Sequence, residues 1–475
     1  MSGAPRAARA LRFSAACCAA LAAAACEHVP PAPIDPSANG ERIAARTLAS
    51  PAVQDALARH GLSVSGNTWS LDQLTLAAWL LRTDVAVAGS ELHAARAATE
   101  VEGQRRNPTV TSPNEKVVDS GAADPWVIGA ALALTFEPGH KRDIRRERAL
   151  AEERALEWRF GETLWAARAE VRTALLDLST ARELVALDDL DAKAAQDYLA
   201  WVETRLQAGA ATTSERLAAV RAVNESASRR GVDAAALATA SATLAATVGV
   251  APRELGALEL AVPGATLQLQ LAADDVDAAR DAALVNRLDV RRALAEYDVA
   301  EQTLRAAVAS QYPDITFAPG YLVDQADHKI TLGLDLPVPL FHNADAQIRR
   351  AIASRAVAAA KFDDVQAAAL ASIDVGFAQY EASRGALGAA ERAERDAQEA
   401  AAALERQRAA GAANRGQVLA GQIALLQLRR TTLAARRAVV DAITALENGI
   451  ERPLYPESSI ETAATIEELL VRAPQ

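Results

Sequence analysis

The sequence predicts a mainly α-helical protein with a small β part, built as two copies of one unit of long antiparallel helices. Three observations carry this prediction. Long stretches consist of Ala with Arg, Glu, Gln and Leu, and only 4% of the 475 residues are aromatic, which favours helices packed through thin seams over thick globular cores. Four segments of about ten residues alternate between apolar and polar positions as strands do. The same order of helices and strands occurs twice along the chain.

The chain begins with a segment typical of a secretory signal. Arg6, Arg9 and Arg12 precede an uncharged run from Phe13 to Ala25, which is too short to span a bilayer as a helix. Cleavage after this segment removes three arginines and leaves 47 basic and 61 acidic residues, a net charge of −14. The sequence therefore predicts an exported protein, and its acidic balance argues against nucleic-acid binding.

All three cysteines, Cys17, Cys18 and Cys26, lie in this opening part of the chain. The rest of the sequence therefore has no disulfide, no thiol nucleophile and no cysteine metal site, and must be held together by packing alone. Cys26 follows the letters LAAAA, which resemble the processing box of bacterial lipoproteins with Ala23 in the position usually held by Leu. We expect lipidation at Cys26, with ordinary cleavage near Ala25 as the alternative.

Two stretches far apart in the chain share Arg, Asp and Val in register, RTDVAV from residue 82 and RLDVRR from residue 287. Asp84 corresponds to Asp289 at an offset of 205, and further matches follow in the same order at offsets of 202 to 205. A duplication explains this order better than coincidence does. The further pairs are Asn107-Pro108 with Tyr312-Pro313, Gly129 with Gly333, IRR at 144 with IRR at 348, Gly209 with Gly411, and Leu217 with Leu419.

These patterns divide the chain into five segments. Each repeat contains a helix of about 35 residues, two strands, a helix of about 70, a Gly-centred turn and a helix of about 36. The segments are a signal peptide over 1–25, an extended or poorly ordered N-terminal arm over 26–70, a first repeat over 71–265, a second repeat over 266–452 and a C-terminal tail over 453–475.

The two longest helices are expected over 139–208 and 342–408, and at 1.5 Å per residue each would span about 100 Å. A further helix is expected over 71–105. The helices expected over 213–249 and 272–309 together have about the length of one long helix, so laid end to end they could lie along it. The stretch 234–251 carries no charge, but its Ala, Thr and Ser give little transfer energy, so we interpret it as a coiled-coil leg and not as a membrane helix.

The four strands are expected over 108–118, 126–137, 313–323 and 329–339. Their length and alternation are typical of transmembrane barrel strands, with aromatic side chains near the ends. Four strands cannot close a barrel, and open edges are not tolerated in lipid, so an embedded barrel would have to be shared between chains. The apolar positions are Trp126, Ile128, Leu132, Leu134 and Phe136, then Ile315, Phe317, Tyr321 and Val323, then Ile330, Leu332, Leu334 and Leu336.

The duplicated order of helix, strand pair, long helix, Gly turn and returning helix resembles the TolC-type family of outer-membrane efflux channels over roughly residues 70 to 450. The motifs YPDI at 312, LPVPLFHNADAQIRRA at 336, RLQAGAATTSERLAAVRA at 205 and RQRAAGAANRGQVLAGQIALLQ at 406 are similar as well. The resemblance implies a homotrimer whose chains share a twelve-stranded barrel, continued by a helical tunnel across the periplasm. It also implies that the tip turns, with Gly209, Thr212, Gly411 and Asn414, contact a periplasmic adaptor protein.

Two sequence details concern which branch of this family the chain resembles and how the periplasmic tip of the channel is closed. FEPGHKRDIRRERA and PLFHNADAQI resemble the heavy-metal efflux branch, although Pro138 to Arg142 only approximates the Gly-Gly-Lys-Arg step of that branch. Some family members close the tip with paired aspartates just after the second Gly turn. Gln417 and Ala420 stand at those positions here, so this sequence departs from that pattern.

The sequence shows no catalytic or cofactor motif. The six histidines are scattered without the spacing of a metal site, and there is no phosphate-binding Gly loop or nucleophile elbow, so we expect no enzyme, no cofactor and no bound metal. The resemblance implies a passive exit duct in the outer membrane of a Gram-negative bacterium, in contact with lipid and driven by an adaptor and an inner-membrane efflux pump. Its cargo would be small molecules or metal cations. The alternative is a soluble periplasmic coiled-coil adaptor or scaffold.

Overall fold

A computed structural model describes residues 29–62, 64, 66–112, 114–118, 126–256, 258–261, 273–324, 327–338 and 344–454. The predicted signal peptide and Cys26 lie outside these residues, as does the tail after residue 454. The chain divides into two compact units at Ala45–Arg46, and each unit is described by itself.

The N-terminal arm differs from the expectation of an extended or poorly ordered segment. In the first unit, α2 (Pro36–Ala44) begins after Asp35, whose side chain accepts a hydrogen bond from the Ser37 N–H at 2.8 Å. In the second unit, α3 (Pro51–Arg59) buries an apolar side made by Val53, Ala56 and Leu57. The prediction was wrong because proline is favourable in the first turn of a helix, where its missing N–H costs nothing.

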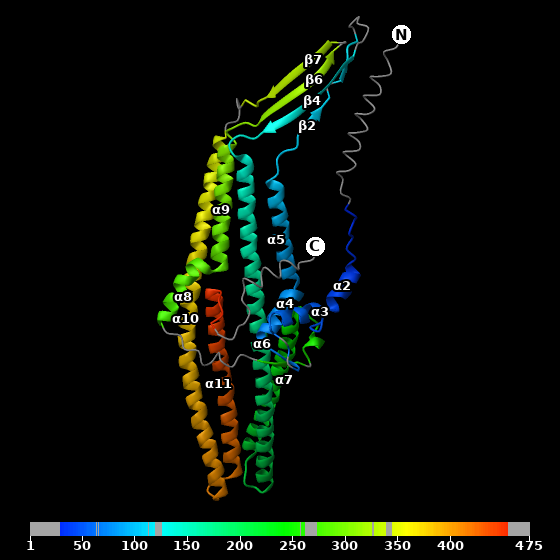
Figure 1. The fold of residues 1–475 in the computed structure, drawn as a ribbon. Helices are drawn as coiled ribbons and strands as arrows, with labels where there is room; N and C mark the ends of the chain where they lie inside the picture. Colours follow the sequence, from blue (N-terminus) through cyan, green and yellow to red (C-terminus); the bar gives the residue numbers. More distant parts are fainter. Residues whose placement is uncertain are drawn as a thin grey trace. The chain divides into compact units, whose positions relative to one another are not determined.

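Four helices form the long part of the second unit (Figure 1). The helices α6 (Lys141–Gln207) and α7 (Thr213–Val248) are antiparallel neighbours, and so are α10 (Asp345–Ala409) and α11 (Arg415–Ile450). Their bounds agree with the predicted ranges to within a few residues. Because α6 also contacts α9 and α11, it joins the two repeats.

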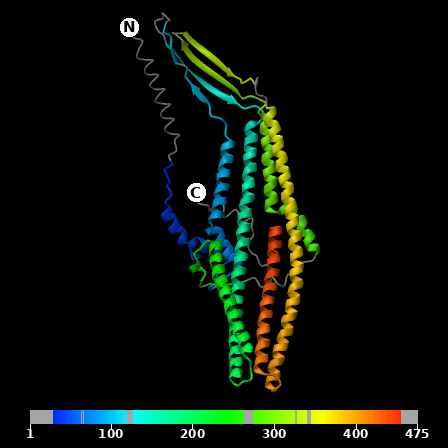
Figure 2. The same cartoon turned by 180° about the vertical axis from the view of Figure 1, so that it is seen from behind.

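Each remaining helix of about 35 residues is in fact two helices. The first repeat has α4 (Leu71–Leu81) and α5 (Thr83–Glu102), and the second has α8 (Ala273–Asn286) and α9 (Leu288–Ala309). The single helices expected over 71–105 and 272–309 were therefore wrong. The chain breaks at Arg82 and Arg287, where the backbone is extended with ψ of 138° and 141°. Helix α5 lies along α6, and α9 lies along α10, in both views (Figures 1 and 2).

The two breaks have the same side-chain contacts, which we call the arginine clasps. Arg82 pairs with Asp84 at 2.6 Å and donates to the carbonyl of Thr247 at the end of α7. Arg287 pairs with Asp289 at 2.7 Å and donates to the carbonyl of Gly449 at the end of α11. A cation at the C-terminal carbonyls of a helix is favourable, and a fork of two N–H groups suits a carboxylate. The clasps therefore explain why Arg and Asp recur in register in the two repeats.

The strands form one antiparallel sheet in the order β2, β4, β6, β7, with β3 also paired to β4. Their bounds are β2 Thr109–Thr111, β3 Asn114–Lys116, β4 Trp126–Phe136, β6 Ile315–Asp324 and β7 Asp327–Asp335. The strands β2 and β3 keep one register against β4, so they act as one interrupted strand, and Pro113, which has no N–H, lies between them in the sequence. Within the described residues the outer edges of β2 and β7 have no partner.

The main core lies where α4 and α5 pack on α6 and the end of α7. Trp79 is buried there and donates its indole N–H to the carbonyl of Leu164 at 2.8 Å. A two-residue parallel ladder, β1 (Thr68–Trp69) with β5 (Glu259–Leu260), connects the start of the first repeat to the segment that follows α7. A smaller cluster around Tyr380 and Ile443 joins α10 to α11.

Among the described residues one helix, α7, is long and apolar enough to cross a membrane by length and composition. Its last turns pack through Leu244, Ala245 and Val248 into the core with α6, and its middle carries Arg229 and Arg230, which pair with aspartates of α6. This arrangement agrees with the interpretation of 234–251 as a coiled-coil leg.

Candidate functional site

The sheet has one strongly apolar face. Register places Leu134 of β4 opposite Phe317 of β6, which in turn lies opposite Leu334 of β7, so the three side chains share a face. The same relation holds along most of β2, β4, β6 and β7, and the large apolar side chains on this face are exposed in the single chain. The polar residues that share this face are Asn114 and Lys116 of β3 and His328 of β7. We call it the apolar face; its exposed members are Val110, Trp126, Ile128, Leu132, Leu134, Phe136, Phe317, Tyr321, Ile330, Leu332 and Leu334.

The opposite face carries mostly small and polar residues, with Val127 and Leu322 as larger apolar ones. Gly129, Gly320 and Gly333 lie on it, and a Cβ added at Gly320 would meet the Thr331 hydroxyl oxygen at 2.6 Å. Side chains on this face are therefore short where neighbouring strands approach, with charged groups such as Asp324 and Lys329 paired at 2.5 Å near the strand ends. A sheet with one apolar face and one face of small and polar residues is typical of transmembrane β-barrels, which have lipid outside and water inside.

The two tip turns have the same geometry. Gly209 and Gly411 have φ of +69° and +80°, and the next N–H in each turn bonds back to the carbonyl five residues earlier. This is the Schellman ending, in which glycine avoids the strain of a left-handed conformation. Thr212 and Asn414 then cap α7 and α11, each in a reciprocal capping box with Glu215 or Gln417.

The capping role explains one departure from the family pattern. The Gln417 side chain accepts the Asn414 N–H at 2.9 Å, so this side chain is used to begin α11. The preceding residue, Gly416, lies against the Trp201 ring of α6, where an added Cβ would come within 2.2 Å of ring carbon. The ends of the two helical hairpins are therefore in contact through Trp201 and Gly416.

The tips also differ in one respect that the repeat pattern does not indicate. Leu217 and Leu419 are equivalent positions, yet Leu217 is 60% exposed while Leu419 is 7% exposed. The first turns of α7 thus present a large apolar side chain without cover in the single chain.

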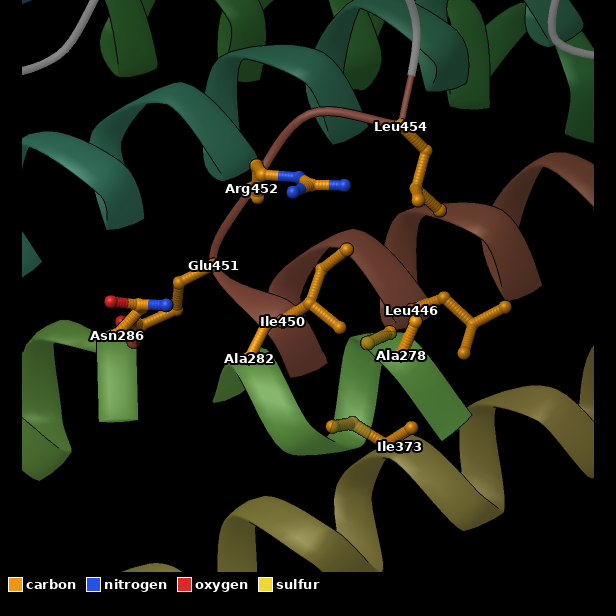
Figure 3. A pocket seen from close by; sticks show the side chains of 10 residues that line it. Ala278, Ala282, Asn286, Ile373, Leu446, Ile450, Glu451, Arg452 and Leu454 are labelled. Carbon is orange, nitrogen blue, oxygen red and sulfur yellow. The ribbon is translucent and has the colours of Figure 1, made fainter. Parts of the chain in front are cut away.

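A cavity of about 450 Å³ lies between α8, α10 and the end of α11. Figure 3 shows Ile373, Leu446 and Ile450 on its apolar side, with Glu451 and Asn286 at its edge. Burial raises the pKa of the Glu451 carboxyl to about 7, although this carboxyl accepts the Leu288 N–H at 2.5 Å and lies 4.0 Å from Arg287.

This raised pKa predicts a specific pH dependence. Between the ordinary value of 4.5 and about 7 the folded chain holds a proton on Glu451 that the unfolded chain has lost. The contribution of this carboxyl to stability is therefore complete below pH 4.5 and is lost as the pH rises through 7. We expect the thermal midpoint of the wild type to fall more steeply from pH 5 to pH 8 than that of Glu451→Gln. Equal slopes for the two proteins would contradict the assignment.

Within the described residues no group of three or more His, Cys, Asp or Glu side chains could hold a metal ion. His140 lies at the start of α6 with its Nδ1 at 3.6 Å from Asp143, which is an ordinary surface contact. His28 and His342 lie outside the described residues.

Comparison with known proteins agrees with this geometry. Residues 279–450 match the family model described as outer membrane efflux protein. No curated protein matches the chain. Among solved structures, the outer-membrane channel OprN is 19% identical, with a TM-score of 0.68 over 81% of this chain and 90% of that one. VceC of Vibrio cholerae is 18% identical, with a TM-score of 0.66 over 81% and 97%.

The transmembrane channel protein CusC is 17% identical, with a TM-score of 0.67 over 81% of this chain and 92% of that one. At these identities the structures show the fold, and the family model adds the sequence signature of the second repeat. Residues 279–450 therefore carry the sequence signature of the family model described as outer membrane efflux protein, and the chain has the fold of the solved outer-membrane channels.

Proposed function

We propose that the protein is the outer-membrane exit duct of a tripartite efflux pump, a passive homotrimer that carries small molecules or metal cations from the periplasmic side to the exterior. The observation that carries this proposal is the sheet, in which large exposed apolar side chains share one face while neither edge has a partner in the part of the chain that the structure describes. In lipid an open edge leaves backbone groups without hydrogen bonds. Three copies of the four-stranded sheet would close a barrel of twelve strands and remove every edge.

The helices support the same proposal. At 1.5 Å per residue, α6 and α10 are each about 100 Å long, which suits a tunnel across the periplasm. A duct of this kind has no energy source of its own, so an inner-membrane pump must drive export and a periplasmic adaptor must join the two. The tip turns at Gly209–Thr212 and Gly411–Asn414 are the proposed adaptor contacts.

The membrane proposal is tested on the purified mature chain. We expect a trimer that needs detergent and conducts ions in a planar bilayer. The part of the tryptophan fluorescence that disappears in Trp126→Phe should be quenched by brominated lipid and shielded from aqueous iodide. A monomer that stays in solution without detergent, with Trp126 open to iodide, would instead support the soluble adaptor or scaffold.

The adaptor proposal is tested at the exposed leucine of the tip. We expect Leu217→Ser to weaken cross-linking to the adaptor about tenfold, because removing one buried apolar anchor from an interface costs 1–2 kcal/mol. The matched control is Val232→Ser, which is also exposed on α7 but lies fifteen residues, about 22 Å, farther along the helix. Neither side chain is buried in the single chain, so the melting temperature should not change. Equal cross-linking by both variants would exclude this part of the tip as a contact.

We make separate proposals for the lipid anchor at Cys26 and for the exported substrate. We propose that Cys26 becomes the acylated first residue, and the intact mass of the mature chain would include the acyl groups if this is right. The heavy-metal branch is proposed from FEPGHKRDIRRERA and PLFHNADAQI. A deletion strain that is sensitive to zinc, cobalt or copper would support this branch, and one sensitive to organic drugs alone would exclude it.

A further inference from the structure

A cavity of about 610 Å³ lies where the first strand pair meets α6. Part of its wall is the lower end of the apolar face, with Leu134 and Phe136 both exposed. Pro108 continues this wall, because the register of β2 against β4 places residue 108 opposite Leu134. The cavity therefore reaches the side of the sheet that the proposed function assigns to lipid, although Thr135, which also lines it, belongs to the opposite face. We call it the junction pocket.

The other wall of the junction pocket is basic. Arg105, Arg106 and Arg142 line it together with the carboxylates Glu137 and Asp143. Asp143 pairs with Arg142 at 3.1 Å and lies 3.6 Å from His140. Within the described residues Arg105 makes no ion pair. Its positive charge is therefore available to an anionic ligand in the pocket.

The carboxylates near the pocket are already neutralised by residues around it. Glu137 accepts two bonds from Arg145, at 2.7 and 3.1 Å, and this guanidinium lowers the pKa of the Glu137 carboxyl. Lys141 pairs with Asp314 at 2.6 Å. Arg106 lies 3.1 Å from Glu137 and 3.4 Å from Asp314, yet it is about half exposed and can turn its free N–H groups toward a ligand.

We propose that the junction pocket binds the phosphate of an anionic phospholipid in the periplasmic leaflet of the outer membrane, with an acyl chain along Leu134 and Phe136. This inference rests on the proposed function, since it needs the apolar face to contact lipid. Guanidinium groups bind phosphate oxygens in a bidentate way, and the first turn of α6 adds N–H groups that no side chain caps. A pocket that is basic on one wall and apolar on the other suits a headgroup at the boundary between water and acyl chains.

The test uses the purified full-length trimer, delipidated and titrated with phosphatidylglycerol, phosphatidylethanolamine or inorganic phosphate under native mass spectrometry. We expect bound phosphatidylglycerol, about tenfold weaker phosphatidylethanolamine, and no displacement of the lipid by inorganic phosphate. Equal binding of the two lipids, or displacement by phosphate alone, would overturn the proposal without any variant.

A matched pair of variants locates the binding. Arg105→Gln with Arg142→Gln should weaken phosphatidylglycerol binding at least about tenfold, because charge-assisted bonds to the phosphate are lost. Arg349→Gln with Arg350→Gln removes the same charge from exposed positions at the start of α10 and should change binding less than about twofold. Equal losses of phosphatidylglycerol binding in both variants would mean that the lipid is attracted by the overall positive charge and not by this pocket. That result would overturn the proposal. A stable trimer without bound lipid contradicts only this inference, whereas a soluble monomer contradicts the proposed function.

Discussion

The substitution Leu332→Arg is expected to remove most of the proposed trimeric channel from the outer membrane. Leu332 lies in the middle of β7 on the apolar face and is 70% exposed in the single chain, so the change breaks no contact within the chain. In a barrel, an arginine on the lipid side near the midplane costs about 2–4 kcal/mol. Every chain of the proposed trimer would carry the change, and the cost arises only if this face contacts acyl chains.

The measurement is the amount of trimer in the outer-membrane fraction, together with the drug and metal tolerance of the strain. The control is Thr331→Arg. Thr331 is the neighbouring residue in the same strand and is also exposed, but it lies on the face of small and polar residues. We expect the control to assemble in near-normal amounts, since a water-filled interior tolerates charge. If the two variants assembled equally well, the apolar face would not be a lipid contact.

The strands were predictable from the sequence because their alternation is local. Each apolar residue of KITLGLDLP is two positions from the next, and no distant residue can change which face it shares. The pairing of β4 with β6 was not predictable in the same way, because it joins residues about 180 positions apart. The structure supplies this register, and only the register shows that β4, β6 and β7 put most of their large apolar residues on one face.

The helix breaks at Arg82 and Arg287 escaped prediction for a similar reason. Both stretches are free of proline and have good helical composition, so local propensity favours continuity. What opposes it is a contact with a carbonyl about 160 residues farther along the chain, Thr247 in one clasp and Gly449 in the other. The recurring Arg and Asp indicated a duplication, but their role at the ends of the returning helices needed the fold.

The tip turns contain one feature that the sequence predicts and one that it does not. AGAATTSE and AGAANRGQ predict the same turn, and the structure has the same Schellman ending and capping box in each. The different exposure of Leu217 and Leu419 was not predictable, because it depends on how the helices of the two hairpins pack at the tip. The contact of the Trp201 ring with Gly416 is part of that packing. A local pattern thus fixes the turn, while the exposed surface of the turn depends on packing between repeats.

A buried ion cluster gives the second large effect. Glu447 of α11 is 1% exposed and pairs with Arg172 of α6, while Arg168 lies 3.9 Å away. Burial lowers the pKa of Arg168, which shows how poorly this region solvates a charge. The other oxygen of Glu447 accepts the Leu454 N–H at 2.8 Å. Glu447 thus pairs with Arg172 and lies near Arg168 at the contact between the two repeats, and the Asp72 carboxylate also acts on Arg168.

Glu447→Gln is therefore expected to lower the free energy of unfolding by about 3–5 kcal/mol, because the buried Arg172 guanidinium loses the charge of the carboxylate with which it pairs. The measurement is chemical unfolding of the detergent-solubilised protein. Asp189→Asn is the control, since its pair with Arg230 also joins two helices but is half exposed on both sides and should cost only about 0–1 kcal/mol. Replacing the pair by Glu447→Leu with Arg172→Met should restore the part of the loss that comes from Arg172, as apolar groups of similar volume need no counter-charge, while Arg168 keeps the nearby Asp72 carboxylate. A loss in Glu447→Gln no larger than in the control would mean that water reaches this cluster and that the repeats are joined by their apolar contacts alone.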